Sequence, residues 1–336
     1  MAAGYAPAAI GTETDGSVIC PSAMTGLVGL KPTIGLVPRT HIVPISHSQD
    51  TAGPMARGVR DVAMLFSAMI ASDPEDPATK DALVHRHDYA AALDTGALRG
   101  LRVGVVRMGG QPAMLARFEA ALAVLRAAGA ELVEVAQPST EGMGAAELRV
   151  LEMELKSGLA AYLATTAPDR VPTRTLADVI AFNKAHAASE MALFGQDLFE
   201  AAEATGGVDD PAYADARATS LRLAGRYGID AMLTGNDVRL LVMPSYGPAW
   251  LSDTVWGDQY EGPSATARVA IAGYPHLTVP MGLADGLPVG LSFVSGAFQE
   301  QLLLNAGYAY EQAAKISVRP SFSPTVDAGH RLDGAR

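Results

Sequence analysis

The chain has 336 residues, of which 49% are hydrophobic and 18% charged, a balance typical of folded globular proteins and not of disordered chains. Its formal net charge of -11 disfavours nucleic acid as a direct partner, because an acidic surface repels the phosphate backbone. The longest apolar stretch, Val62–Ala71, is about half as long as the ~20 residues that a membrane-spanning helix needs. We therefore expect a buried helix there and no membrane anchor.

The first half of the chain predicts strands and turns followed by alternating helices and strands. Residues 1–55 are rich in Gly, Pro and Thr with short apolar runs, which favours strands and turns. A helical pattern over residues 58–71 precedes a polar, proline-bearing loop at 72–81. Next come a strand at 101–106, an amphipathic helix at 114–129 and a strand at 131–135. This order is a βαβ unit and favours an α/β fold.

The second half predicts a helical region and then a return to strands. Residues 140–235 are mainly helical, with a break near 167–173. Further strands are expected at 239–243, 276–279 and 289–294, followed by a closing helix at 299–314. No long flexible linker interrupts the chain, so we expect one domain over residues 1–336.

Cysteine and histidine usage gives no support to a metal site or cofactor. Cys20 is the only cysteine and cannot form an internal disulfide, and the seven histidines include no HExxH arrangement. Met1 leads into AAGYAPAAIG, which has neither the basic start nor the apolar core of a secretory signal. We expect a cytoplasmic protein with no metal and no cofactor.

The segment TETDGSV over residues 12–18 carries the first chemical signal. Gly16 permits a backbone conformation with positive φ or a close approach, so Ser17 can stand exposed on a tight turn. Nearby backbone N–H groups would then stabilise the oxyanion of an acyl-transfer intermediate. A plain Gly-Ser turn fits the local spacing equally, and no GxSxG elbow occurs in the chain.

The longer context decides between these two interpretations. The Gly11–Val18 segment is followed by GLVGLKPT and GLVPR, and then by SQDTAGPMAR over residues 48–57. In order and spacing these motifs resemble those of the amidase signature family. Segments LADVIAFNKAH, PSYGPAW and AGYPHLTVPMGLADGLPVG resemble the peptide-amidase-like branch, so the resemblance covers nearly the whole chain.

The resemblance implies a large mixed β-sheet sandwiched between layers of α-helices. It also implies hydrolysis of a small-molecule or peptide amide, with Ser17 forming an acyl-enzyme and releasing ammonia or an amine. Backbone N–H groups of Thr14, Asp15, Gly16 and Ser17 would form the oxyanion hole. The family activates its nucleophile with a second serine and a lysine, in the manner of Ser-Lys variants of the catalytic triad.

The sequence departs from that family pattern at the relay. The second serine and the lysine lie upstream of the nucleophile in the family, but no serine or lysine precedes Ser17 here. Lys31, in the GLKPT turn, is interpreted as structural. We therefore expect an amidase whose N-terminal third is missing and whose activity is impaired. Apolar faces would be left uncovered unless a homo-oligomer or another chain supplies the missing segment.

Other residues near the signature leave two interpretations open. Asp15 either faces the substrate or caps its own turn. Asp50 either orients the turn that carries Ser17 or caps a turn at Gly53–Pro54. Tyr246 and Trp250, with Trp256, either line a substrate pocket or anchor loops, and Cys20 is interpreted as packing.

Two other functions remain as alternatives to amide hydrolysis by this chain. One is a non-catalytic remnant or binding protein that keeps the amidase fold, which the absent upstream serine and lysine favour. The other is a subunit of a glutamine-dependent tRNA amidotransferase, which shares the fold and signature. The acidic charge and the peptide-amidase-like second half disfavour this last function.

Overall fold

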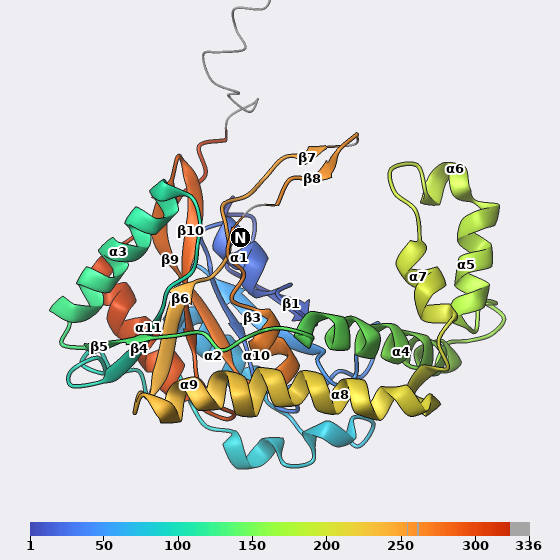
Figure 1. Ribbon diagram of the computed structural model, residues 1–336, viewed down its shortest axis with the longest axis horizontal. Helices are drawn as coiled ribbons and strands as arrows, with labels where there is room; N and C mark the ends of the chain where they lie inside the picture. The colour runs from blue at the N-terminus through green and yellow to red at the C-terminus, as the bar shows by residue number, and fades with distance from the viewer. Residues whose placement is uncertain (254, 261, 323–336) are drawn as a thin grey trace, which may run out of the picture.

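The computed structural model describes residues 1–253, 255–260 and 262–322, and its centre is an eight-stranded mixed sheet (Figure 1). The strand order is β1-β3-β2-β9-β10-β6-β4-β5. The strands are β1 (Ala8–Glu13), β2 (Val28–Lys31), β3 (Thr51–Ala56), β4 (Arg102–Val106), β5 (Glu131–Val135), β6 (Leu240–Pro244), β9 (His276–Ala284) and β10 (Leu287–Val294). The expected mixed sheet of an α/β protein is confirmed.

The pairing of neighbouring strands changes once across this sheet, from antiparallel to parallel. From β1 to β6 every neighbouring pair is antiparallel, whereas β6, β4 and β5 run parallel to one another. The parallel pair β4 and β5 is joined by α3 (Pro112–Ala127), so the predicted βαβ unit is confirmed. The two predicted strands near the C-terminus, 276–279 and 289–294, belong to one longer hairpin, in which β9 continues to Ala284 and β10 begins at Leu287.

Helices cover both faces of the sheet. On one face, α2 (Val59–Met69), α3 and α11 (Glu300–Ala314) pack against β3, β2 and β9 and bury most of the apolar core. The other face carries α1 (Ile19–Met24), which contacts β2, β9 and β10. Nearby lie α8 (Pro211–Ala224), η4 (Gly225–Ile229), α9 (Asp230–Gly235) and α10 (Ala267–Ala272). The turn that carries Ser17 lies at the junction of β1 and α1.

Two features project from this body on one side (Figure 1). The first is an arm of helices at the end of α4 (Met143–Ala164), formed by α5 (Leu176–Ala185), α6 (Ala187–Glu190) and α7 (Asp197–Glu203). The second is a small hairpin of β7 (Ser252–Asp253) and β8 (Gly257–Asp258). Two short 3₁₀ helices, η1 (Pro77–Thr79) and η2 (Ala82–His85), follow α2, and η3 (Gly207–Asp209) precedes α8.

The prediction of strands and turns over residues 1–55 is wrong at α1. The sequence ICPSAM has no helical repeat of apolar residues and contains Pro21, which argues against a helix. In the structure Pro21 lies in the first turn of α1, where a backbone N–H has no intrahelical partner to lose. Gly53 and Pro54 likewise form no turn, because both lie within β3.

In the part of the chain that the structure describes, no helix combines the length and apolar character required to cross a bilayer.

Candidate active site

Ser17 lies on a sharp turn between the end of β1 and the start of α1, and its side chain is exposed. Gly16 has φ 89°, in the left-handed region that favours glycine. A Cβ at Gly16 would also lie 3.2 Å from Thr266 Oγ1 and 3.4 Å from the Tyr246 hydroxyl. Glycine is therefore required both for the backbone conformation and for the close packing behind Ser17.

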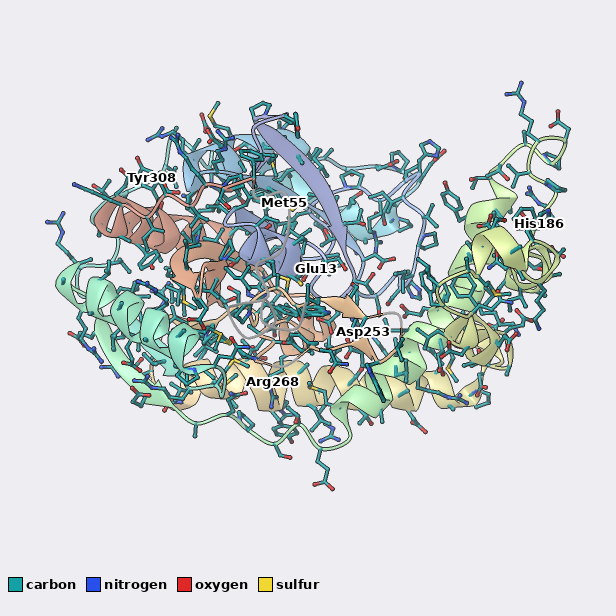
Figure 2. The ribbon with its side chains drawn as sticks, turned by 90° about the horizontal axis from the view of Figure 1, so that it is seen from above. Glu13, Met55, His186, Asp253, Arg268 and Tyr308 are labelled. Atoms are coloured by element: carbon teal, nitrogen blue, oxygen red, sulfur yellow. The ribbon has the colours of Figure 1, made fainter. Side chains whose placement is uncertain are left out.

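Glu13 holds the far side of this turn from within the core (Figure 2). Its side chain is 1% exposed, and Oε2 accepts hydrogen bonds from the backbone N–H groups of Val18 at 2.8 Å and Ile19 at 2.9 Å. Burial raises the pKa of Glu13, an effect that the charge of Lys31 opposes. Both groups that Glu13 binds are otherwise free donors at the first turn of α1. No local sequence pattern indicates this role of Glu13.

Lys31 lies behind the same turn and is fully buried in β2. Its Nζ donates a hydrogen bond to Pro32 O at 3.0 Å. Desolvation lowers the pKa of Lys31 to about 8, although the charges of Glu13, Glu300 and Asp15 oppose that shift. Within the described residues, Ser17 Oγ makes no hydrogen bond with Lys31 or with any other basic side chain.

Asp50 fixes the front of the turn through Thr14. Its Oδ1 accepts a hydrogen bond from Thr14 Oγ1 at 2.5 Å, and its Oδ2 accepts from the N–H groups of Ile45 and Ser46 at 2.9 and 2.8 Å. These contacts join the Ser17 turn to the loop before β3. Of the two interpretations of Asp50, these contacts favour the one in which it orients the turn that carries Ser17, and the capping of a turn at residues 53–54 is wrong.

Buried polar side chains of Asp15, Gln49 and Glu147 surround the turn. The Gln49 side chain, 0% exposed, donates from Nε2 to Thr14 O at 3.3 Å and to Glu147 Oε1 at 3.0 Å. Burial raises the pKa of Asp15, with the Thr266 side chain acting against the shift. Asp15 Oδ1 and Gln49 Oε1 are buried without a hydrogen-bond partner in the described part of the chain. The turn thus faces an environment rich in hydrogen-bond acceptors.

Glu147, near the Ser17 turn, could have been identified from the sequence as a buried acidic residue. It lies on α4 seven residues before Glu154, on a stripe that also buries Val150 and Met153. Acidic residues on the apolar stripe of a helix require partners inside the protein. Glu154 supplies such an anchor, since its carboxylate accepts from Ser48 N at 3.1 Å and holds the loop that carries Asp50.

The pKa of Glu147 predicts a measurable pH dependence of stability. Burial and the nearby Asp15 charge raise this pKa from an ordinary 4.5 to about 7. Between these values the folded state keeps a proton that the unfolded state has released, so this stabilisation is present below pH 4.5 and lost as pH rises through 7. Glu147→Gln is expected to reduce the decrease in the free energy of unfolding with rising pH. The variant should be about 1–2 kcal/mol more stable than the parent at pH 8.

Urea unfolding at pH 5 and pH 8 measures this difference, with the exposed Glu141→Gln as the matched control. If the free energy of unfolding depends on pH equally in the Glu147 variant and the parent protein, the raised pKa of Glu147 is contradicted.

Aromatic side chains extend from the turn toward the β7–β8 hairpin. The ring of Tyr246 lies 5.4 Å from that of Tyr260, which in turn lies 4.9 Å from the ring of Trp250. The Tyr246 hydroxyl lies beside Gly16, so this group of three rings begins at the Ser17 turn. Trp256 is 79% exposed on the hairpin and lies outside the group.

Cys20 and the cleft beside Asp50 complete the surroundings. Cys20 Sγ contacts Met24 Sδ at 3.7 Å within α1, and burial raises the pKa of its thiol to about 11, so it is no ready nucleophile. A cleft of about 730 Å³ is lined by Arg39, His47 and Asp50, but Ser17 does not line it. Among the described residues, no cluster of three or more His, Cys, Asp or Glu side chains is arranged to hold a metal ion.

Comparison with known proteins agrees with this geometry. The family model described as Amidase matches residues 1–304. The chain belongs to the amidase family. It is 33% identical over 322 residues to a probable amidase of Arabidopsis thaliana, covering 93% of this chain and 58% of that protein. It is also 36% identical to a glutamyl-tRNA(Gln) amidotransferase subunit of Rhodospirillum rubrum, over 96% of this chain and 65% of that protein.

Among solved structures, this amidase-family chain is similar to the native peptide amidase of Stenotrophomonas maltophilia. The two share 47% sequence identity with a TM-score of 0.87, over 96% of this chain and 65% of that chain. The peptide-amidase-like branch expected from the sequence is thereby confirmed. The chain spans less than two thirds of the length of each of these three relatives.

Proposed function

We propose that this protein hydrolyses amides with Ser17 as the nucleophile. Ser17 Oγ attacks the amide carbonyl carbon, its proton passes through a base to the leaving nitrogen, and the C–N bond breaks to give an acyl-enzyme. Water then releases the carboxylic acid and restores the serine. The observation that carries the proposal is the exposed Ser17 on a turn fixed from both sides by Glu13 and Asp50.

The backbone of the same turn supports the proposed oxyanion hole at residues 14–17. The N–H groups of Asp15 and Ser17 donate to no acceptor within the described residues, whereas that of Val18 is bound to Glu13. Free N–H groups in a rigid turn next to the nucleophile are the donors that a developing oxyanion requires. Glu13 supports this arrangement indirectly, because it fixes the peptide planes that follow Ser17.

The proton acceptor is the part of the mechanism that these residues do not supply. No serine or lysine precedes Ser17 in the 336 residues, and Ser17 makes no hydrogen bond to a basic group in the described part of the chain. Lys31 follows Ser17 and is bound to Pro32 O behind the turn. We therefore expect slow hydrolysis by these residues alone and fast hydrolysis when a relay serine and lysine are present.

For the substrate, we propose a small-molecule or peptide amide bound beside the aromatic group of Tyr246, Tyr260 and Trp250. The support is the contact of Tyr246 with the Gly16 turn and the continuity of the rings toward the exposed hairpin. Similarity to a peptide amidase points to the same class of substrate. We propose a cytoplasmic location, because with a single cysteine nothing in these residues requires an oxidising compartment.

Ammonia release from a panel of simple and peptide amides tests the proposal. We expect release by the chain that is lost in Ser17→Ala and kept in Ser22→Ala. Ser22 is the matched control, because it lies nearby in α1, is fully buried, and its Oγ has no partner in the described residues. Hydrolysis that survives Ser17→Ala would contradict the assignment of the nucleophile.

A second candidate function is that of an amidotransferase subunit, favoured by the 36% identity to the Rhodospirillum rubrum protein. The higher identity to the peptide amidase, 47%, and the net charge of -11 favour amide hydrolysis instead. Stable co-purification with a second subunit and transfer of ammonia to a charged tRNA would establish the alternative. A folded chain that stays inactive when a relay serine and lysine are supplied would instead establish a non-catalytic protein with the amidase fold.

A further inference from the structure

Arg268 is a buried cation in this acidic protein. It lies in α10 and is 8% exposed, packed against η4 and the end of α8 (Figure 2). Arginine is always charged at physiological pH, so its guanidinium cannot escape burial by losing a proton. Such a group normally has a carboxylate partner inside the protein.

No ion pair joins Arg268 to a carboxylate in the part of the chain that the structure describes. Its hydrogen bonds go to backbone carbonyls, from Nη1 to Leu223 O at 2.9 Å and from Nη2 to Pro138 O at 2.5 Å and Ser139 O at 3.2 Å. Nε makes none within the described residues. Burial alone lowers the pKa of Arg268, with no nearby charge acting on it. The cation is therefore held by carbonyl oxygens alone, with no carboxylate as counter-charge, and its Nε–H is left without an acceptor in the described residues.

The backbone around Arg268 is shaped to receive this side chain. Residues 225–229 form a π-helical turn, η4, directly after α8, and Leu223 O, one residue before the end of α8, accepts a hydrogen bond from the guanidinium. A Cβ at Gly228 would lie 2.8 Å from Arg268 Nη1 and 2.6 Å from Leu223 O. The close approach of the guanidinium thus depends on glycine at this position.

Beside Arg268 is a cavity of about 110 Å³ whose lining is mostly apolar with a few polar side chains. Gln137, Thr140 and Ser264 line it together with Arg268, and the remaining walls are largely apolar, with Met232 and Met243 among them. Gln137 and Met108 also line a more open hollow of about 570 Å³, so these two side chains lie between the cavity and that hollow. A volume of 110 Å³ exceeds the ~15 Å³ that one water requires and suits a molecule of a few heavy atoms.

We propose that this cavity binds a short-chain monocarboxylate, with its carboxylate on Arg268 and its alkyl chain against the methionine-lined walls. A carboxylate supplies the missing counter-charge and matches the planar fork of a guanidinium. Flexible methionine side chains fit an alkyl chain of variable shape. The small volume and apolar walls exclude phosphorylated ligands, whose second charge would have no partner. The site is independent of the proposed amide hydrolysis.

Thermal unfolding of the 336-residue chain with sodium butyrate as the probe tests this site. Sodium chloride at equal ionic strength and uncharged butyramide are the controls. We expect a saturable rise in Tm with butyrate, because a ligand bound only to the folded state stabilises it, and no such rise with either control. Arg268→Gln is expected to weaken butyrate binding about tenfold or more, whereas the exposed Arg226→Gln leaves it unchanged.

A second variant decides the outcome if Arg268→Gln does not fold. Ala265 lines the cavity and is 7% exposed, so Ala265→Leu fills the space and leaves the guanidinium in place. We expect this variant to lose the butyrate-dependent rise in Tm. A rise no larger than that with sodium chloride, or unchanged butyrate affinity in Ala265→Leu, would overturn the proposal. Because the readout is binding, it stands apart from any failure to hydrolyse amides.

Discussion

Supplying a relay serine and lysine is expected to raise the rate of amide hydrolysis by about 10²- to 10⁴-fold. The donor is a segment of the Stenotrophomonas maltophilia peptide amidase, chosen where the amidase signature pattern places the relay serine and lysine and joined to Met1. That protein is the suitable donor because it is 47% identical with a TM-score of 0.87. The physical reason is that Ser17 has an exposed hydroxyl and free neighbouring N–H groups, but no proton acceptor in the described residues. Ammonia release from a peptide amide measures the gain.

Two variants of the joined protein separate the relay from a general gain in folding. Replacing the donated relay lysine with methionine is expected to return the rate to that of the 336-residue chain while the Tm stays near that of the joined protein. Ser17→Ala is expected to remove the activity altogether. If the joined protein folds and hydrolyses amides no faster than the chain alone, the assignment of this turn as a catalytic one is wrong.

Glu13→Ala is expected to lower the free energy of unfolding by about 3 kcal/mol or more. The change leaves the N–H groups of Val18 and Ile19 buried without an acceptor, and each such group costs about 1–3 kcal/mol. It also opens a cavity at a side chain that is 1% exposed. Urea unfolding measures the loss. Because the same bonds fix the peptide after Ser17, hydrolysis is expected to fall with them.

Glu13→Gln is the matched control for this prediction. A glutamine oxygen still accepts from both N–H groups, and burial already disfavours the charged form of Glu13 by raising its pKa. We expect the glutamine variant to keep most of the stability that the alanine variant loses. Equal losses in the two variants would show that the Glu13 charge, rather than its hydrogen bonds, holds the turn.

The sequence predicts most of the fold, because its strands and helices have strong local patterns. The ELVEV strand is found with the predicted bounds, and α2, α3 and α11 begin and end within two residues of their predictions. It fails at α1, whose six residues take their stability from tertiary contacts with β2, β9 and β10 rather than from a periodic pattern. It also shortens β9, since Pro280 and Gly282 interrupt the apolar run there although Met281 and Ala284 are buried in the strand.

The candidate site is less visible in the sequence than the fold. The TETDGSV segment indicates Ser17 because a glycine directly before a serine is a local sign of a tight turn, which the positive φ of Gly16 confirms. The residues that support the turn come from segments far apart in the chain. Gln49 and Glu147 meet through a side-chain bond across 98 residues, and no local pattern encodes such a pair. The role of Arg268 cannot be predicted from the sequence either, since nothing near it in the chain shows that it lacks a carboxylate partner.

Identification of the acylated residue tests the central claim most directly. The joined protein is quenched with acid during turnover of a slowly hydrolysed ester, digested, and the acyl group located by tandem mass spectrometry. We predict the added acyl mass on Ser17, and no added mass on any residue of the Ser17→Ala variant. An acyl group on another residue, with hydrolysis that persists in Ser17→Ala, would contradict the claim that Ser17 is the nucleophile.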